Sequence, residues 1–213
     1  MSHYLLELAA LMAVFSFGIV VPGADLAMVM RQSLTHGRRA AIATSFGIGT
    51  ALLFHVGYTV LGIGLIVSQS ILAFNIVKWV GAAYLFYLGW RSIREANVPE
   101  MPEIDPAERA RPMSDAKAFG MGFLTNALNP KPVLFFLTLF SSLVSLETPT
   151  LVKIGYGLVM ASALILWFVG VSFFFTIPAI RQSFVRAGRW ITRATGFVFI
   201  GLGLKLATEK MHG

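Results

Sequence analysis

Two short segments combine proline with polar or ionisable residues inside otherwise apolar stretches of the chain. The first is Val21-Pro22-Gly23-Ala24-Asp25. Proline removes a backbone hydrogen bond and glycine allows bending, so a helix should be interrupted here. A carboxylate within a membrane span costs about 2.5–3.5 kcal/mol near the bilayer centre, and such a residue usually faces a cavity or a partner. We expect Asp25 to line a substrate path. The alternative is a proline kink near a helix end, with Asp25 wetted at the interface or capping the next helical segment.

The second segment is Asn126-Ala127-Leu128-Asn129-Pro130-Lys131-Pro132. Its two prolines should interrupt a helix as well. Asn126 and Asn129 lie three residues apart and share a helix face. Buried amides and a buried ammonium need hydrogen-bond partners. We expect these asparagines and Lys131 to bind a substrate, with Lys131 holding a carboxylate or pairing with Asp25. The alternative is that the asparagines join helices and Lys131 extends to the membrane surface.

His55 lies in the middle of a long apolar stretch, and an imidazole titrates near neutral pH. It is a candidate proton relay beside Asp25; the alternative is a hydrogen-bonded interior histidine. The sequence has no cysteine, no histidine–glutamate cluster with metal-ligand spacing, and no GxxxxGK[ST] loop. Thiol chemistry, zinc–thiolate sites and a built-in ATPase are therefore excluded, and we expect no metal and no cofactor.

The composition shows what surrounds these residues. Of 213 residues, 56% are hydrophobic and 13% charged, against roughly 45–50% and about 25% in an ordinary soluble domain. At about 20 residues per span, this length holds six membrane-spanning helices with short loops. The net charge of +7 is not gathered in a basic run, so we expect no nucleic-acid partner. The sequence predicts an all-α polytopic membrane protein and leaves no room for a soluble catalytic domain.

Windows free of charge locate the expected spans. They are predicted at about residues 5–30, 41–66, 71–93, 117–145, 151–177 and 190–208. A segment rich in proline and charge, 96–116, should be a solvated cytoplasmic linker. It divides one membrane domain into two halves, 1–95 and 117–213, with three helices each.

The two halves resemble each other. Three positions of the first half recur 108 residues later: Pro22 as Pro130, Gly47 as Gly155, and Gly49 as Gly157. Because three spans carry the chain across the membrane, the second half enters from the opposite side. The sequence therefore predicts two inverted three-helix repeats, an arrangement found in many secondary transporters.

The basic residues predict an orientation. Three odd-numbered connections hold 12 of the 17 basic residues: Arg31, Arg38 and Arg39; Arg91, Arg94, Arg109, Arg111 and Lys117; and Arg181, Arg186, Arg189 and Arg193. Cytoplasmic loops carry an excess of lysine and arginine, so these connections should be cytoplasmic and both termini periplasmic.

Several motifs resemble the LysE/RhtB family of amino-acid exporters. Pro22-Gly23-Ala24-Asp25 resembles its PGP(D/N) motif, Asn129-Pro130-Lys131 its NPK motif, and Gly81-Ala82-Ala83-Tyr84-Leu85 its third-span signature. The resemblance implies six helices in a bacterial inner membrane and export of amino acids or their derivatives, coupled to protons. Two departures leave the substrate unnamed. Ala24 replaces the usual second proline, and Ser141-Ser142-Leu143-Val144 stands where many members have a Pro-Gln-Phe-Val-like sequence.

The expected function is therefore a secondary transporter that exports amino acids by proton antiport, and not an enzyme. Asp25, Asn126, Asn129 and Lys131 are the predicted substrate-binding residues, and Asp25 and His55 the predicted proton-coupling residues. The expected partners are an amino acid, protons and lipid, and glycine-faced helices favour a homodimer. One alternative is a membrane-embedded acid–base enzyme, which lacks an accompanying nucleophile or metal set. Another is a non-transporting scaffold, which has no use for matched helix breaks.

Overall fold

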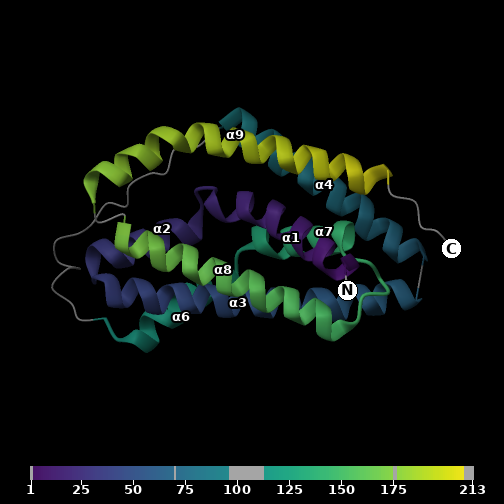
Figure 1. Ribbon diagram of the computed structural model, residues 1–213, viewed down its shortest axis with the longest axis horizontal. Coiled ribbons are helices and arrows are strands. Elements are labelled where there is room, and N and C mark those ends of the chain that lie inside the picture. Colours follow the sequence, from purple (N-terminus) through teal and green to yellow (C-terminus); the bar gives the residue numbers. More distant parts are fainter. Residues whose placement is uncertain (1, 70, 96–112, 175–176, 209–213) are drawn as a thin grey trace.

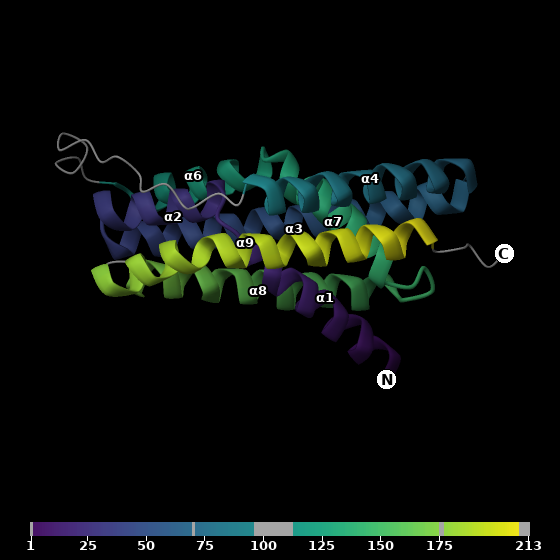
Figure 2. The ribbon, with the colours of Figure 1, turned by 90° about the horizontal axis from the view of Figure 1, so that it is seen from above.

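The computed structural model describes residues 2–69, 71–95, 113–174 and 177–208. Every element within these ranges is an α-helix, which confirms the predicted all-α class. The helices are α1 (Ser2–Val20), α2 (Ala24–Thr35), α3 (Arg38–Gln69), α4 (Ile71–Glu95), α6 (Asp115–Ala127), α7 (Pro130–Leu143), α8 (Thr150–Phe174) and α9 (Pro178–Thr208). They run roughly along one axis and form an elongated bundle (Figure 1, Figure 2).

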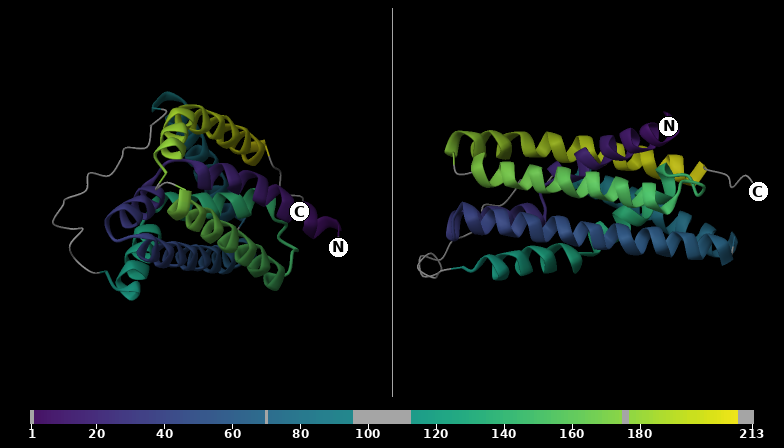
Figure 3. Two further views of the ribbon diagram at one scale, coloured as in Figure 1. Left: turned by 60° about the vertical axis from the view of Figure 1, so that its left-hand side comes forward. Right: turned by 60° about the horizontal axis from the view of Figure 1, so that its bottom comes forward.

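The two halves of the chain contribute the same order of elements. In each half an interrupted helix, α1–α2 or α6–α7, is followed by two long helices. The halves pack into each other: α3 contacts both α6 and α8, and α4 lies along α9. The pair α4 and α9 forms one side of the bundle, α3 and α6 form the opposite side, and α1 and α7 lie between them (Figure 3).

The basic helix ends gather at one end of the bundle. α1 begins and α9 ends at the right-hand end of Figure 1, whereas α6 and α9 begin at the left-hand end, beside the α2–α3 connection. The starts of α3, α6 and α9 therefore lie at the end of the bundle away from the start of α1.

Four helices are long and apolar enough to cross a membrane, judged by length and composition over the described residues. These stretches are His3–Val20, Arg38–Gly62, Thr150–Phe174 and Arg186–Thr208. α4 has 25 residues but is not among them, and the fourth expected span is divided between α6 and the shorter apolar helix α7. The described residues thus show a polytopic membrane protein with four candidate spans and shorter apolar helices.

Two helix boundaries differ from the sequence-based expectation. α3 passes through Gly62 and continues to Gln69 instead of ending near residue 66. A glycine inside a helix costs only about 1 kcal/mol, which is not enough to end it. α9 begins at Pro178 rather than at residue 190. Proline suits the first turn of a helix, and Arg186 and Arg189 further along α9 are exposed.

Most of the expected linker 96–116 lies outside the described residues. Its end is described: the Ser114 side chain accepts a hydrogen bond from the Lys117 backbone N–H and caps α6. Next to this cap, the Arg39 guanidinium donates to both carboxylate oxygens of Asp115 and joins α3 to α6. The hydrogen bonds from Arg39, together with its positive charge, lower the pKa of Asp115.

Glycines allow α3 and α6 to touch backbone to backbone. A Cβ at Gly122 would overlap the Thr44 carbonyl oxygen, and a Cβ at Gly47 would overlap the Phe119 carbonyl oxygen. The Thr44 hydroxyl donates across this contact to the Ala118 carbonyl at 3.1 Å. Because α6 ends about one turn after Gly122, this contact sets the position of the second helix interruption.

Candidate functional site

The first interruption leaves the start of α2 without a side-chain cap. α1 ends at Val20 and α2 begins at Ala24, so that Pro22 and Gly23 lie between the two helices. Gly23 is the N-cap, in extended conformation, and has no side chain to satisfy the first backbone N–H groups of α2. Asp25 lies in the first turn, where the partial positive charge of a helix N-terminus stabilises a carboxylate.

The second interruption lies just before the two prolines. α6 ends at Ala127 and α7 begins at Pro130, preceded by Asn129 as N-cap. The Asn129 Oδ1 accepts from the Lys131 backbone N–H at 3.0 Å. Pro130 and Pro132 both lie in the first turn of α7, where a missing N–H costs no intrahelical hydrogen bond. The asparagine and the prolines therefore define where α7 starts.

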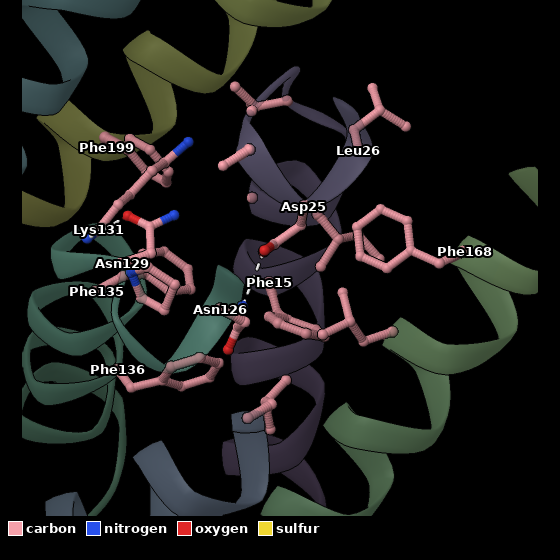
Figure 4. Close-up of a pocket in the computed structure, with 18 residues that line it drawn as sticks. Phe15, Asp25, Leu26, Asn126, Asn129, Lys131, Phe135, Phe136, Phe168 and Phe199 are labelled. Carbon is pink, nitrogen blue, oxygen red and sulfur yellow. Dashed lines mark hydrogen bonds between the residues drawn. The ribbon is translucent and has the colours of Figure 1, made fainter. Parts of the chain in front are cut away.

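The two interruptions meet inside the bundle. The Asn126 Nδ2 donates to the Asp25 Oδ2 at 2.8 Å, across 101 positions of sequence (Figure 4). A cavity of about 90 Å³ lies beside this bond, and Asp25, Asn126, Asn129 and Lys131 all line it. Lys131 and Asn129 approach from α7, on the other side of the cavity from Asp25 (Figure 4). The structure thus brings the four expected binding residues to one cavity.

Two acceptor atoms at this cavity have no partner within the described part of the chain. They are the Asp25 Oδ1 and the Asn126 Oδ1, and both are buried. An unsatisfied buried acceptor costs about 1–3 kcal/mol, so a donor from outside the chain would be stabilised here. Across the cavity, the N-terminus of α7 and Lys131 supply positive charge. The arrangement can therefore hold an ammonium on one side and a carboxylate on the other.

His55 is fully buried on α3. It contacts Asn126, which in turn binds Asp25. Its Nε2 lies 3.2 Å from the Asn126 carbonyl oxygen, and its Nδ1 lies 2.6 Å from the Tyr58 hydroxyl. Both contacts are satisfied by a neutral ring that donates from Nε2 and accepts at Nδ1. The described cavity lining does not include His55. It contacts the backbone of the residue that binds Asp25, and not Asp25 itself.

A second carboxylate, Glu7, is buried as well. Its place near the outer end of the first expected span favours a position at the membrane interface, yet it is only 5% exposed. It accepts from the Ser145 backbone N–H at 2.8 Å, from the Thr148 hydroxyl at 2.9 Å and from the Tyr156 hydroxyl at 2.9 Å. These donors lie more than 130 positions away in sequence, so no local pattern announces them. Glu7 fastens the start of α1 to the connection between α7 and α8.

A polar cavity between two interrupted helices is an arrangement found in many secondary transporters. The family model described as LysE type translocator matches residues 16–210, and the chain belongs to this family. This confirms the resemblance seen in the motifs.

Three relatives show what the family contains. The uncharacterised membrane protein YahN of Escherichia coli (strain K12) is 33% identical, over 88% of this chain and 83% of its own length. The threonine efflux protein of the same strain is 26% identical, over 90% and 93%. The homoserine/homoserine lactone efflux protein of Salmonella typhimurium is 29% identical, over 89% and 90%. No solved structure matches the chain.

Proposed function

We propose that this protein is a secondary transporter that exports amino acids or amino-acid derivatives across the bacterial inner membrane in exchange for protons. The relatives named for efflux of threonine and of homoserine support the substrate class and the direction. The observation that carries the proposal is the cavity at the two helix interruptions. It offers unpartnered acceptors at Asp25 and Asn126 and positive charge at Lys131.

In this proposal the two charged groups of a zwitterion bind at opposite sides of the cavity. The substrate ammonium donates to the Asp25 Oδ1 and the Asn126 Oδ1, which have no other donor among the described residues. The substrate carboxylate lies against Lys131 and the N-terminus of α7. The Asn129 Oδ1 is used in capping α7, so its Nδ2 remains to donate to the carboxylate.

Asp25 is the proposed coupling group because an ammonium and a proton compete for the same carboxylate. When the substrate leaves, a proton neutralises Asp25 and removes the cost of an unpaired charge within the membrane. The neutral carrier then returns and releases the proton. His55 is the second candidate, acting through Asn126, whose carbonyl it contacts.

The finer architecture is part of the same proposal. The matching element order of the two halves supports two inverted repeats, α1–α4 and α6–α9, around the cavity. The arginine-rich end of the bundle would face the cytoplasm, and both termini the periplasm. Gly57, Gly155 and Gly201 meet no atom within 4 Å, which leaves room for helices of a second protomer in a homodimer.

Purified protein in lipid vesicles tests the proposal. Vesicles loaded with radiolabelled amino acids should exchange them across the membrane, and a proton gradient should drive accumulation of chemically unchanged amino acid. Lys131→Ala should weaken substrate binding at least tenfold, while Lys117→Ala, at the exposed start of α6, should behave as the parent. Chemical conversion of the labelled compound would favour the enzyme alternative, and absence of any movement would favour the scaffold.

A further inference from the structure

Apart from four polar side chains, the described residues that line the cavity are apolar. Among the described residues that line it, only Asp25, Asn126, Asn129 and Lys131 have polar side chains. Five phenylalanines from four helices supply much of the rest: Phe15, Phe135, Phe136, Phe168 and Phe199, each at most 7% exposed. Figure 4 shows Phe135, Phe136 and Phe199 on the Lys131 side of the cavity, and Phe168 on the far side of Asp25 from Lys131. A substrate held by its ammonium and carboxylate would place its side chain against them.

Four of these rings, those of Phe15, Phe135, Phe136 and Phe199, pack against one another and form a fixed surface. The ring centroids of Phe135 and Phe199 lie 5.6 Å apart, and those of Phe15 and Phe136 lie 6.0 Å apart. Phe135 also packs at the edge of Phe136, with centroids 5.5 Å apart. A Cβ at Gly18 would lie 3.2 Å from the Phe135 Cζ, so the absence of a side chain there makes room for this ring. Mutually packed aromatic rings give a wall that is formed before the substrate arrives.

No polar side chain of the described lining remains for a substrate side chain. Asp25 and Asn126 are occupied by the ammonium, and Lys131 and Asn129 by the carboxylate. A side-chain hydroxyl would lose its water and gain no hydrogen bond from the phenylalanine wall. Apolar pockets discriminate against an added hydroxyl of the same size by about 100-fold at most. A charged side chain would be excluded more strongly.

The size of the cavity limits the substrate as well. A single water occupies about 10–15 Å³ of such space, so about 90 Å³ accommodates roughly as many heavy atoms as valine or leucine contains. Resting on the proposed function, we infer that the transported solutes are amino acids with aliphatic side chains of this size. Threonine and homoserine, after which two of the relatives are named, are poor substrates of this chain.

Valine and threonine form the sharpest pair for the test because they differ by a methyl group and a hydroxyl. In exchange assays with the full protein in vesicles, valine should compete with labelled leucine about 10- to 100-fold better than threonine does. Threonine that competes as well as valine would overturn this inference and leave the proposed transport intact. Absence of exchange with any amino acid would overturn the proposed transport and this inference together.

A matched pair of variants tests whether the apolar wall of the cavity contacts the side chain of the substrate. Val21 lines the cavity, whereas its neighbour Val20 does not. Val21→Thr keeps the shape and adds a hydroxyl partner, so it should reduce the preference for valine over threonine by about 3- to 10-fold, as one hydrogen bond would. Val20→Thr should leave the ratio unchanged. The same preference in the parent and in a fully active Val21→Thr variant would contradict the assignment.

Discussion

Replacing Gly122 by alanine should disturb the proposed site through the contact between α3 and α6. The new Cβ would overlap the Thr44 carbonyl oxygen and lie 2.9 Å from the Thr44 carbonyl carbon. Ordinary carbon contacts are about 3.5–4.0 Å, so α3 and α6 must separate by more than half an ångström. Asn126 lies one turn further along α6, and its 2.8 Å hydrogen bond to Asp25 would be stretched out of the normal range.

Gly120→Ala on the same helix is the matched control. A Cβ at Gly120 meets no atom within 4 Å. Both substitutions gain about 0.5–1 kcal/mol from the better helix propensity of alanine, so the difference between them isolates the steric cost. Overpacking of this kind costs about 1–3 kcal/mol. Gly122→Ala should therefore unfold at lower temperature than Gly120→Ala in detergent.

Amino-acid exchange in vesicles provides the second measurement. Gly122→Ala should lose at least tenfold in exchange rate, while Gly120→Ala should match the parent. If Gly122→Ala is as stable and as active as Gly120→Ala, the backbone contact between α3 and α6 is wrong and so is the position it gives to Asn126.

Three further outcomes are expected. Glu7→Gln presents an amide N–H₂ to a site filled with donors and should lower the free energy of unfolding by about 1–3 kcal/mol. The measurement is the shift of the melting temperature in detergent. An unchanged melting temperature would contradict the buried hydrogen-bond network around Glu7. Asp115→Asn removes an exposed pair with Arg39 and should lower the melting temperature only slightly, and less at high salt. Because Arg39 lowers the pKa of Asp115, the contribution of this pair is complete above the ordinary carboxyl pKa and is lost only below it, so the effect of Asp115→Asn should not vary between about pH 5 and pH 8. Asn129→Ala should weaken substrate binding and leave proton coupling in place, seen as a higher apparent substrate constant with an unchanged dependence on the proton gradient.

Local chemistry made part of this structure predictable from the sequence. Composition alone indicates helices in a membrane, and proline fixes a backbone angle and removes an N–H wherever it occurs. Pro22 and Pro130 therefore mark places where the helices are interrupted, as the structure shows. That these interruptions lie together could be predicted only from the order of elements in the two halves.

Contacts between distant positions were not predictable in the same way. Glu7 was placed at the interface because its neighbours in sequence give no sign of Ser145, Thr148 and Tyr156. The phenylalanines of the cavity wall are indistinguishable in sequence from those that face lipid, such as Phe197. α9 begins at Pro178, before the expected span at 190–208, because arginine is a good helix former outside the apolar part of a helix as well.

The behaviour of Asp25→Asn tests the central claim most directly. Asparagine keeps the size of the side chain and can still bind Asn126, but it cannot take up and release a proton. In vesicles, this variant should exchange amino acids in the absence of a gradient, with weakened binding, and should fail to accumulate them against a concentration difference at any proton gradient. Accumulation by Asp25→Asn equal to that of the parent at every pH would show that Asp25 does not couple transport to protons, and His55 would become the next residue to test.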